Sequence, residues 1–185
     1  MKYMTIFLLT IVLSAGCIPA KKTDEDVPDS LGEVSESDLI TELTAIFKAP
    51  EQYRSSNRPY QICDRLAEIS PTALAPIVEL LGSPSSTPET KIFILQAINA
   101  NMTEAYLPQL RPLVNSEDSV TRSCATNLLG PIKTDEVKEL LLRLKEDPSP
   151  NVSFSAWSGL AQHGVEPHRT EFVQFYSDPK SDADQ

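Results

Sequence analysis

Residues 119–130 read SVTRSCATNLLG and residues 151–161 read NVSFSAWSGLA, and the likeness between these two stretches decides the fold. In each stretch an apolar or small residue returns every four positions, and its counterpart stands 32 residues further along the chain. The matched pairs are Val120 with Val152, Cys124 with Ala156, and Leu128 with Leu160. Apolar residues at this spacing are typical of one face of an α-helix. The sequence therefore indicates one helical unit that occurs twice.

The same pattern extends towards the N-terminus. Ile94 and Ile98 match Cys124 and Leu128 at a step of 30, and Cys63 matches Ile94 at a further 31. Between Ser37 and Ser177, apolar residues fall three and four apart in about nine segments, separated by Pro, Gly, Asn and Asp. No segment shows the sustained alternation of a β-strand. We therefore predict an all-α domain over residues 37–177.

Helix-start signals agree with this prediction, because Ser, Thr, Asp and Pro are favoured at the first positions of helices. The predicted starts are Ser37-Asp38, Pro71-Thr72, Pro88-Glu89-Thr90, Thr134-Asp135-Glu136 and Pro148-Ser-Pro150-Asn151. Pro76 and Pro108 fall inside apolar segments, at matching places in two successive units. A proline lacks the backbone N–H that a helix interior needs, so we expect these two to kink or delay their helices.

The clearest unit consists of residues 117–130 and 136–148: an acidic turn, then Val, a small residue, Leu and Gly, then a Leu-rich second helix. This unit resembles a HEAT repeat of the short-period form called PBS-lyase-like, which belongs to the armadillo-like helical solenoids. The resemblance covers about residues 37–177; Ile94 in place of a small residue and Pro112 inside a second helix depart from it. It implies a short right-handed α-α superhelix of about nine helices, a half unit followed by four pairs. The other interpretation is an irregular helical bundle.

The first residues read MKYMTIFLLTIVLSAGC, a basic start, a short apolar run and small residues, which is the anatomy of an export signal. The end of this run, up to Gly16 and Cys17, resembles the lipobox of bacterial lipoproteins. The resemblance implies cleavage between Gly16 and Cys17, which removes residues 1–16, and acylation of Cys17 with palmitate or similar chains. Ile18 in place of Asp after the cysteine favours the outer membrane of a Gram-negative bacterium. The alternatives are an ordinary secretory signal and an uncleaved anchor.

Residues 17–36 comprise Cys17 and then the acidic stretch IPAKKTDEDVPDSLGEVSE, which offers little to bury. We predict a flexible linker there, spanning on the order of 25 Å, and a polar tail over residues 178–185. The formal net charge of the chain is −10. That charge argues against nucleic acid as a partner and against electrostatic adhesion to anionic lipid. The membrane contact is predicted to run through the lipid anchor.

Residues that could perform chemistry are few. Two histidines, His163 and His168, flank Glu166, but no third His or Cys lies near them, so we predict neither a metal site nor a cofactor. No phosphate-binding loop or nucleophile motif occurs, and we predict no enzyme activity. Cys63 and Cys124 fall at equivalent positions two units apart. We expect them about 20 Å apart as buried free thiols, because a disulfide spans less than about 7 Å between Cα atoms.

The second helices of HEAT-like units line the concave face, which resembles a protein-docking groove in that family. The candidate partner-binding residues on or beside these helices are Tyr106, Arg111, Lys138, Arg143 and Arg169. Tyr and Arg are common anchors at interfaces. Trp157 is predicted to pack between repeats.

The leading hypothesis is a membrane-anchored, non-catalytic scaffold or adaptor that binds a protein in the periplasm or at the cell surface. One alternative is a permanent structural subunit of an envelope complex, bound through the aromatic C-terminal end at Phe172, Phe175 and Tyr176. Another is a lyase-like enzyme subunit, which rests on analogy of fold alone.

Overall fold

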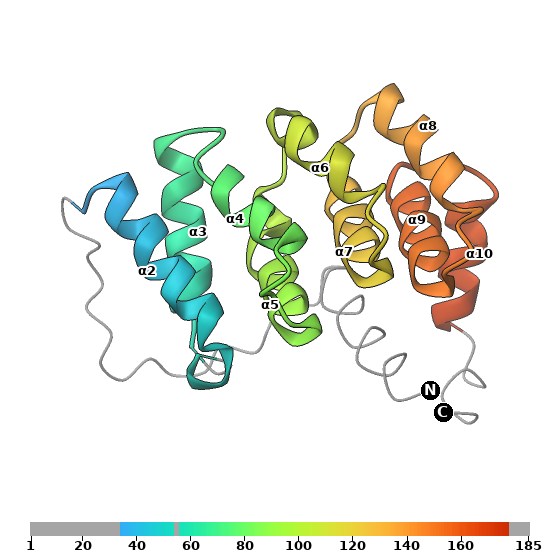
Figure 1. Ribbon diagram of the computed structural model, residues 1–185. Coiled ribbons are helices and arrows are strands. Elements are labelled where there is room, and N and C mark those ends of the chain that lie inside the picture. The colour runs from blue at the N-terminus through green and yellow to red at the C-terminus, as the bar shows by residue number, and fades with distance from the viewer. Residues whose placement is uncertain (1–33, 54–55, 178–185) are drawn as a thin grey trace.

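The computed structural model of the protein describes residues 34–53 and 56–177, and their regular structure is helical throughout, which confirms the all-α prediction. These residues form nine α-helices, labelled as in Figure 1. Their bounds are Glu36–Lys48 (α2), Arg58–Ile69 (α3), Ala75–Glu79 (α4), Pro88–Ile98 (α5), Leu107–Leu113 (α6), Ser119–Leu129 (α7), Asp135–Leu144 (α8), Pro150–Gln162 (α9) and His168–Ser177 (α10). Short 3-10 turns at Pro50–Gln52, Leu80–Gly82, Asn99–Asn101 and Glu104–Tyr106 fill several of the connections.

The helices follow one another across the molecule in chain order (Figure 1). Helices α3, α5, α7 and α9 form a first row in which each packs against the next. Helices α4, α6 and α8 form a second row along one side of the first; α4 packs on α6, and α8 packs on both α7 and α9. Helix α2 packs on α3 at one end and α10 packs on α9 at the other. One hydrophobic core runs between the two rows.

Residues 32 positions apart occupy corresponding places on α7 and α9. Cys124 and Ala156 are both fully buried, as are Leu128 and Leu160. Polar groups follow the same step, because Ser123 Oγ and Ser155 Oγ are hydrogen-bonded at 3.1 Å across the α7–α9 interface. Val152 is buried too, while Val120 is half-buried against the core. The 32-residue step found in the sequence therefore also relates residues that pack at corresponding positions on α7 and α9.

Most predicted helix starts lie within a residue of the observed ones, and side chains cap several of them. Thr134 Oγ1 accepts from the Val137 N–H, and α5 and α9 begin at their prolines. Helix α2 begins at Glu36 with Ser35 as its cap, slightly before the predicted Ser37. The start predicted at Pro71 is wrong, because residues 71–74 form turns and α4 begins only at Ala75.

Pro76 and Pro108 are each the second residue of a helix, α4 and α6. The prolines delay these helices, as predicted, because a proline fits the first turn and disturbs any later one. Pro112 lies inside α6, which ends at Leu113. Helices α4 and α6 are consequently the two shortest of the described α-helices, with 5 and 7 residues.

Cys63 and Cys124 are buried free thiols, as predicted. Burial raises the pKa of each to about 12, which keeps both protonated and unreactive at neutral pH. Trp157 is half-buried, with its ring centroid 5.4 Å from that of Phe154 on the same helix.

The leader over residues 1–16, Cys17, nearly all of the linker predicted at 17–36 and the tail at 178–185 lie outside the described residues. The side chains of Phe172, Phe175 and Tyr176 lie outside them as well. Over the part that is described, no helix has the length and apolar character needed to span a bilayer.

Candidate functional site

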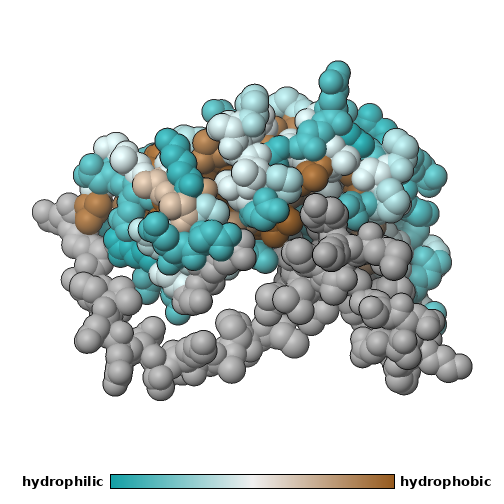
Figure 2. Space-filling view, turned by 60° about the horizontal axis from the view of Figure 1, so that its bottom comes forward, coloured by the Kyte–Doolittle hydropathy of each residue, from teal (hydrophilic) through white to brown (hydrophobic). Residues whose placement is uncertain are grey.

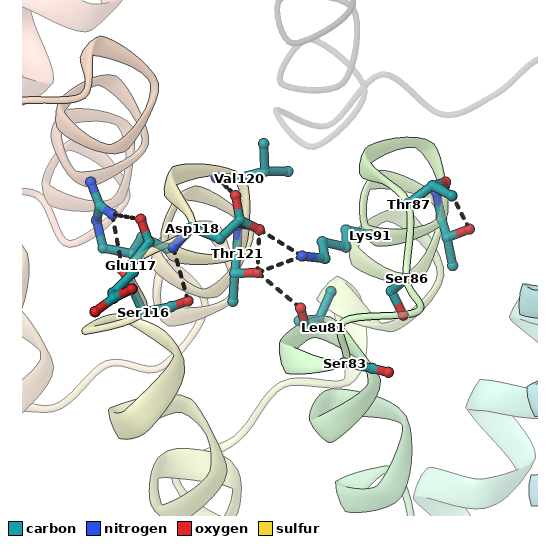
Figure 3. Close-up of polar contacts among 12 residues, drawn as sticks. Leu81, Ser83, Ser86, Thr87, Lys91, Ser116, Glu117, Asp118, Val120 and Thr121 are labelled. Carbon is teal, nitrogen blue, oxygen red and sulfur yellow. Dashed lines mark hydrogen bonds and ion pairs between the residues drawn. The ribbon is translucent and has the colours of Figure 1, made fainter.

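A buried polar contact ties α5 to α7 (Figure 3). Lys91 on α5 is 7% exposed and points at the N-terminus of α7, where its Nζ donates to Asp118 Oδ2 at 2.6 Å and to Thr121 Oγ1 at 2.8 Å. Thr121 Oγ1 in turn lies 2.9 Å from the carbonyl oxygen of Leu81. Asp118 also caps α7 by accepting from the N–H groups of Val120 and Thr121. Every polar atom named here has a partner, so the cluster fastens neighbouring units together.

Electrostatics reinforce this contact. Burial on its own would raise the pKa of Asp118, but the hydrogen bonds from Lys91, Thr121 and the Val120 N–H, with the Lys91 charge, outweigh it and lower that pKa to about 2. The carboxylate is therefore ionised at any physiological pH, and the pair stays charged.

A second ion pair joins α7 to the loop between α8 and α9. Arg122 on α7 contacts Asp147 through two hydrogen bonds of 3.0 Å each, and it also donates to the carbonyls of Ser116 and Glu117. The hydrogen bonds from Arg122 are the main reason why the pKa of Asp147 is lowered. Both side chains are less than one-fifth exposed, so this pair is structural as well.

The five candidate partner-binding residues do not share one surface. Tyr106 is the clearest correction, because it is fully buried. Its Oη accepts a hydrogen bond from the Leu74 N–H at 3.4 Å, and burial raises its pKa even though that hydrogen bond acts in the opposite direction. Tyr106 ends a 3-10 turn just before α6, and this turn directs the ring into the core rather than to the outer surface. It is not available to a partner.

Arg111 on α6 lies at the surface. Its Nε and Nη2 both donate to Glu136 Oε1 of α8, at 3.0 and 2.6 Å, and both side chains are more than half exposed. An exposed pair of this kind contributes roughly 0.2–1 kcal/mol. Replacing Glu136 by a carboxylate of a partner would therefore cost Arg111 little free energy. The Arg111–Glu136 pair also marks the place where α6 and α8 approach each other, which is called the seam below.

Arg143 and Lys138 are both exposed on α8, but on different edges. Five positions on a helix turn through about 140° beyond one full circle, whereas seven positions return to nearly the same side. Arg143 therefore shares the edge of Glu136, beside α6, while Lys138 lies on the edge towards the α9–α10 loop. The charge of Lys138 contributes to lowering the pKa of His163, which begins that loop, and this agrees with the placement.

Leu142, beside Arg143 in the chain, is 42% exposed, one of the few large apolar side chains at the surface of the described residues. Sequence reasoning missed it. The signal was present, because a helix with one buried face cannot bury three consecutive leucines such as Leu140, Leu141 and Leu142. Arg111, Glu136 and Arg143 together are called the α6–α8 surface below; Leu142 is four positions from Lys138 and lies nearer the edge of Lys138 than that of Glu136.

Arg169 is exposed on the first turn of α10, on a different helix pair from the α6–α8 surface. In the view of Figure 2, turned by 60° from that of Figure 1, the described surface that is in sight is mainly hydrophilic, with hydrophobic residues in separate small spots.

The histidines stand at the two ends of the α9–α10 loop. His163 Nε2 and His168 Nδ1 are buried and have no hydrogen-bond partner among the described residues. Glu166 does not join them, because its Oε2 accepts from Thr170 Oγ1 at 2.7 Å. Among the residues that the structure describes, no three His, Cys, Asp or Glu side chains gather closely enough to hold a metal ion.

Comparison of the chain with models of known protein families, with curated proteins and with solved structures finds no match. The α6–α8 surface is therefore the feature from which a function is inferred.

Proposed function

We propose that this chain is a bacterial lipoprotein, held at the membrane by acylated Cys17, whose HEAT-like solenoid acts as a non-catalytic scaffold that binds a protein partner. The partner contacts the α6–α8 surface in the periplasm or at the cell surface, and the anchor lies in the outer membrane. The right-handed superhelix implied by the HEAT resemblance is part of this proposal. Two rows of helices with a 32-residue packing step on α7 and α9 support it.

The observation that carries the proposal is the pair of exposed arginines, Arg111 and Arg143, on the α6–α8 surface. Arg143 is exposed and makes no ion pair with any described residue. Arg111, on the facing helix, forms one ion pair, with the exposed carboxylate of Glu136. Arginine is enriched among the residues that dominate binding energy at protein interfaces. On a chain of net charge −10, two arginines along one seam single out a carboxylate-bearing partner surface.

The binding test reverses charge along the seam. The double variant Arg111→Glu with Arg143→Glu is expected to lose its crosslinked partner in intact cells. The matched control is Lys138→Glu, which reverses an exposed charge on the same helix but on the other edge. Partner capture that survives the double variant, or that fails equally in the control, contradicts the α6–α8 surface as the binding site.

The anchor has its own test. Cys17→Ser is expected to abolish labelling by a palmitate analogue and to move the protein from the membrane fraction to the soluble fraction. Cys63→Ser serves as the control, because that thiol is buried in α3 and its loss leaves the label in place. A wild-type chain without the label contradicts the lipoprotein part of the proposal and leaves the binding surface to be judged separately.

One observation favours a second candidate, a permanent structural subunit of an envelope complex. Val173 on α10, the last described helix, is 56% exposed, the most exposed large apolar side chain among the described residues. A permanent partner would cover it. Crosslinking that yields one stoichiometric complex through α10 supports this candidate, whereas several weaker partners through α8 support the adaptor.

A further inference from the structure

Glu136 already places a carboxylate on one arginine of the α6–α8 surface. Arg111 Nε and Nη2 both donate to the same oxygen of this side chain, Oε1, at 3.0 and 2.6 Å. The other carboxylate oxygen accepts no hydrogen bond from a described residue, and both side chains are more than half exposed. The contact therefore uses part of the guanidinium and part of the carboxylate, and water reaches both groups.

Arg143 continues this surface along α8. It follows Glu136 by seven positions, which returns it to nearly the same side of the helix and places it about 10 Å further along the axis. Arg143 is exposed and forms no ion pair with a described residue. The α6–α8 surface thus carries two cations along one line, the first paired with an internal acid and the second unpaired.

The spacing and the type of these cations indicate what they bind. The planar fork of a guanidinium matches a carboxylate, and the Arg111–Glu136 contact is an example within the chain itself. A protein segment presents two carboxylates about 10 Å apart when they are three residues apart in an extended strand or seven apart on a helix. Such a segment can reach Arg111 and Arg143 together.

Displacing Glu136 leaves the rest of α8 undisturbed. Glu136 is the second residue of this helix, where the helix dipole favours a negative charge, so the released carboxylate stays stabilised and solvated. The cap of α8 does not depend on it either, because Thr134 Oγ1 accepts from the Val137 N–H. A partner can therefore take the place of Glu136 without a change in the fold.

We propose that Glu136 is an internal competitor for Arg111, and that the α6–α8 surface selects an acidic protein segment with two carboxylates about 10 Å apart. The first carboxylate of the segment displaces Glu136, and the second binds Arg143. A segment with one acid gains little, because on Arg111 it only replaces an equivalent carboxylate. This inference rests on the proposed function, since it names the chemistry of the partner at the same surface.

The test uses a synthetic helical peptide with two glutamates seven residues apart in a background of alanine and glutamine. Its binding to the full-length chain in a neutral detergent is measured by fluorescence polarisation at low ionic strength, where exposed charges are least screened. We expect the wild type to bind this peptide several-fold more tightly than a peptide in which either glutamate is glutamine. Glu136→Gln is expected to tighten binding about two- to fivefold, because the competing ion pair is weak.

The chain offers a matched control for this variant. Glu89 is the second residue of α5, as Glu136 is of α8, and it is also exposed. Glu89→Gln therefore makes the same change of charge at the same position of a helix that does not form the α6–α8 surface, and it should leave the affinity nearly unchanged.

The two arginines are tested in combination with Glu136→Gln. Arg111→Gln should weaken binding and should also remove the gain from Glu136→Gln, because the two side chains compete through one contact. Arg143→Gln should weaken binding and preserve that gain.

Three results would each overturn the proposal: equal gains in Glu136→Gln and Glu89→Gln, a gain that persists in the Arg111→Gln background, or equal binding of the one-acid and two-acid peptides. If any of them occurs while the charge-reversed Arg111 and Arg143 variant still loses its crosslinked partner, the binding surface stands and only its acidic specificity is rejected. Partner capture that survives charge reversal removes the binding surface itself.

Discussion

Lys91 shows how a single residue can make one interface between units specific. Its long side chain is buried against α7, where an apolar residue would pack at lower desolvation cost, and it ends on Asp118 and Thr121. Buried pairs of this kind add little net stability, yet breaking one partner is costly because a charge is left behind. Replacing Asp118 is therefore expected to cost more stability than replacing Lys91.

We predict that Asp118→Asn destabilises the protein by about 1–2 kcal/mol, because it removes the charge that faces the buried Lys91 ammonium, while the asparagine still caps α7. Lys91→Met should cost much less, since its partner Asp118 is 46% exposed on the side-chain scale and can be solvated. Urea unfolding of both variants at neutral pH measures the difference. Equal losses of unfolding free energy in the two variants would contradict the buried contact between the Lys91 ammonium and Asp118.

The same pair predicts a pH dependence. The pKa of Asp118 is lowered from 3.8 to about 2, so its ionisation stabilises the folded state above pH 3.8, and this contribution disappears as the pH falls towards 2. Because the carboxylate is partly exposed, solvent screening reduces the contribution to about 1 kcal/mol. The Lys91→Met variant should lose this acid-labile part, which a comparison of stabilities at pH 5 and pH 2.5 would reveal.

At the scale of the element, side-chain caps and prolines set the helix lengths. Thr134 accepts from the Val137 N–H at 3.3 Å and starts α8, the helix that carries Glu136, Leu142 and Arg143. Thr134→Ala should cost about 1 kcal/mol, and Thr134→Ser should restore most of it because serine caps equally well. Thermal unfolding measures both variants. A Ser variant as weak as the Ala variant would show that the methyl group, and not the hydroxyl, matters.

Sequence reasoning at this scale succeeded where periodicity and capping agreed, as in α5 and α8. It failed where a turn intervened between helices. Tyr106 follows the pattern of a second helix, yet a 3-10 turn at Glu104–Tyr106 directs its ring inwards. Whether a residue beside a helix start faces the core or the solvent depends on this local turn, and hydrophobic spacing does not encode it.

The surface was the least predictable part for a related reason. Arg111 and Arg143 were expected on one face and do lie on either side of the α6–α8 seam, because α6 and α8 approach each other there. Lys138 and Arg169 are grouped with them in the prediction because they too lie on or beside second helices. Which edge of a helix faces its neighbour depends on how the rows pack, and a single sequence without contacts does not fix that geometry.

At the scale of the whole molecule, the question is whether the helices behave as a chain of neighbours or as one cooperative body. In a solenoid each unit contacts only the next, so a defect at one end loosens that end first. Gly159 on α9 and Leu43 on α2 lie near opposite ends of the array and are both buried. They allow a reciprocal test of the proposed architecture.

A Cβ at Gly159 would stand 3.0 Å from both Leu141 methyl carbons, and Leu141 is itself fully buried and has little room to move. Gly159→Val should therefore cost about 3 kcal/mol by overpacking α8 against α9, and amide exchange should rise in α8, α9 and α10 while α2 and α3 stay protected. Leu43→Ala, at a cost of about 2–5 kcal/mol, should loosen α2 and α3 and leave α9 protected. If either substitution raises exchange equally in all nine described helices, the array unfolds as one unit, and the nearest-neighbour behaviour expected of a HEAT-like solenoid does not hold for this chain.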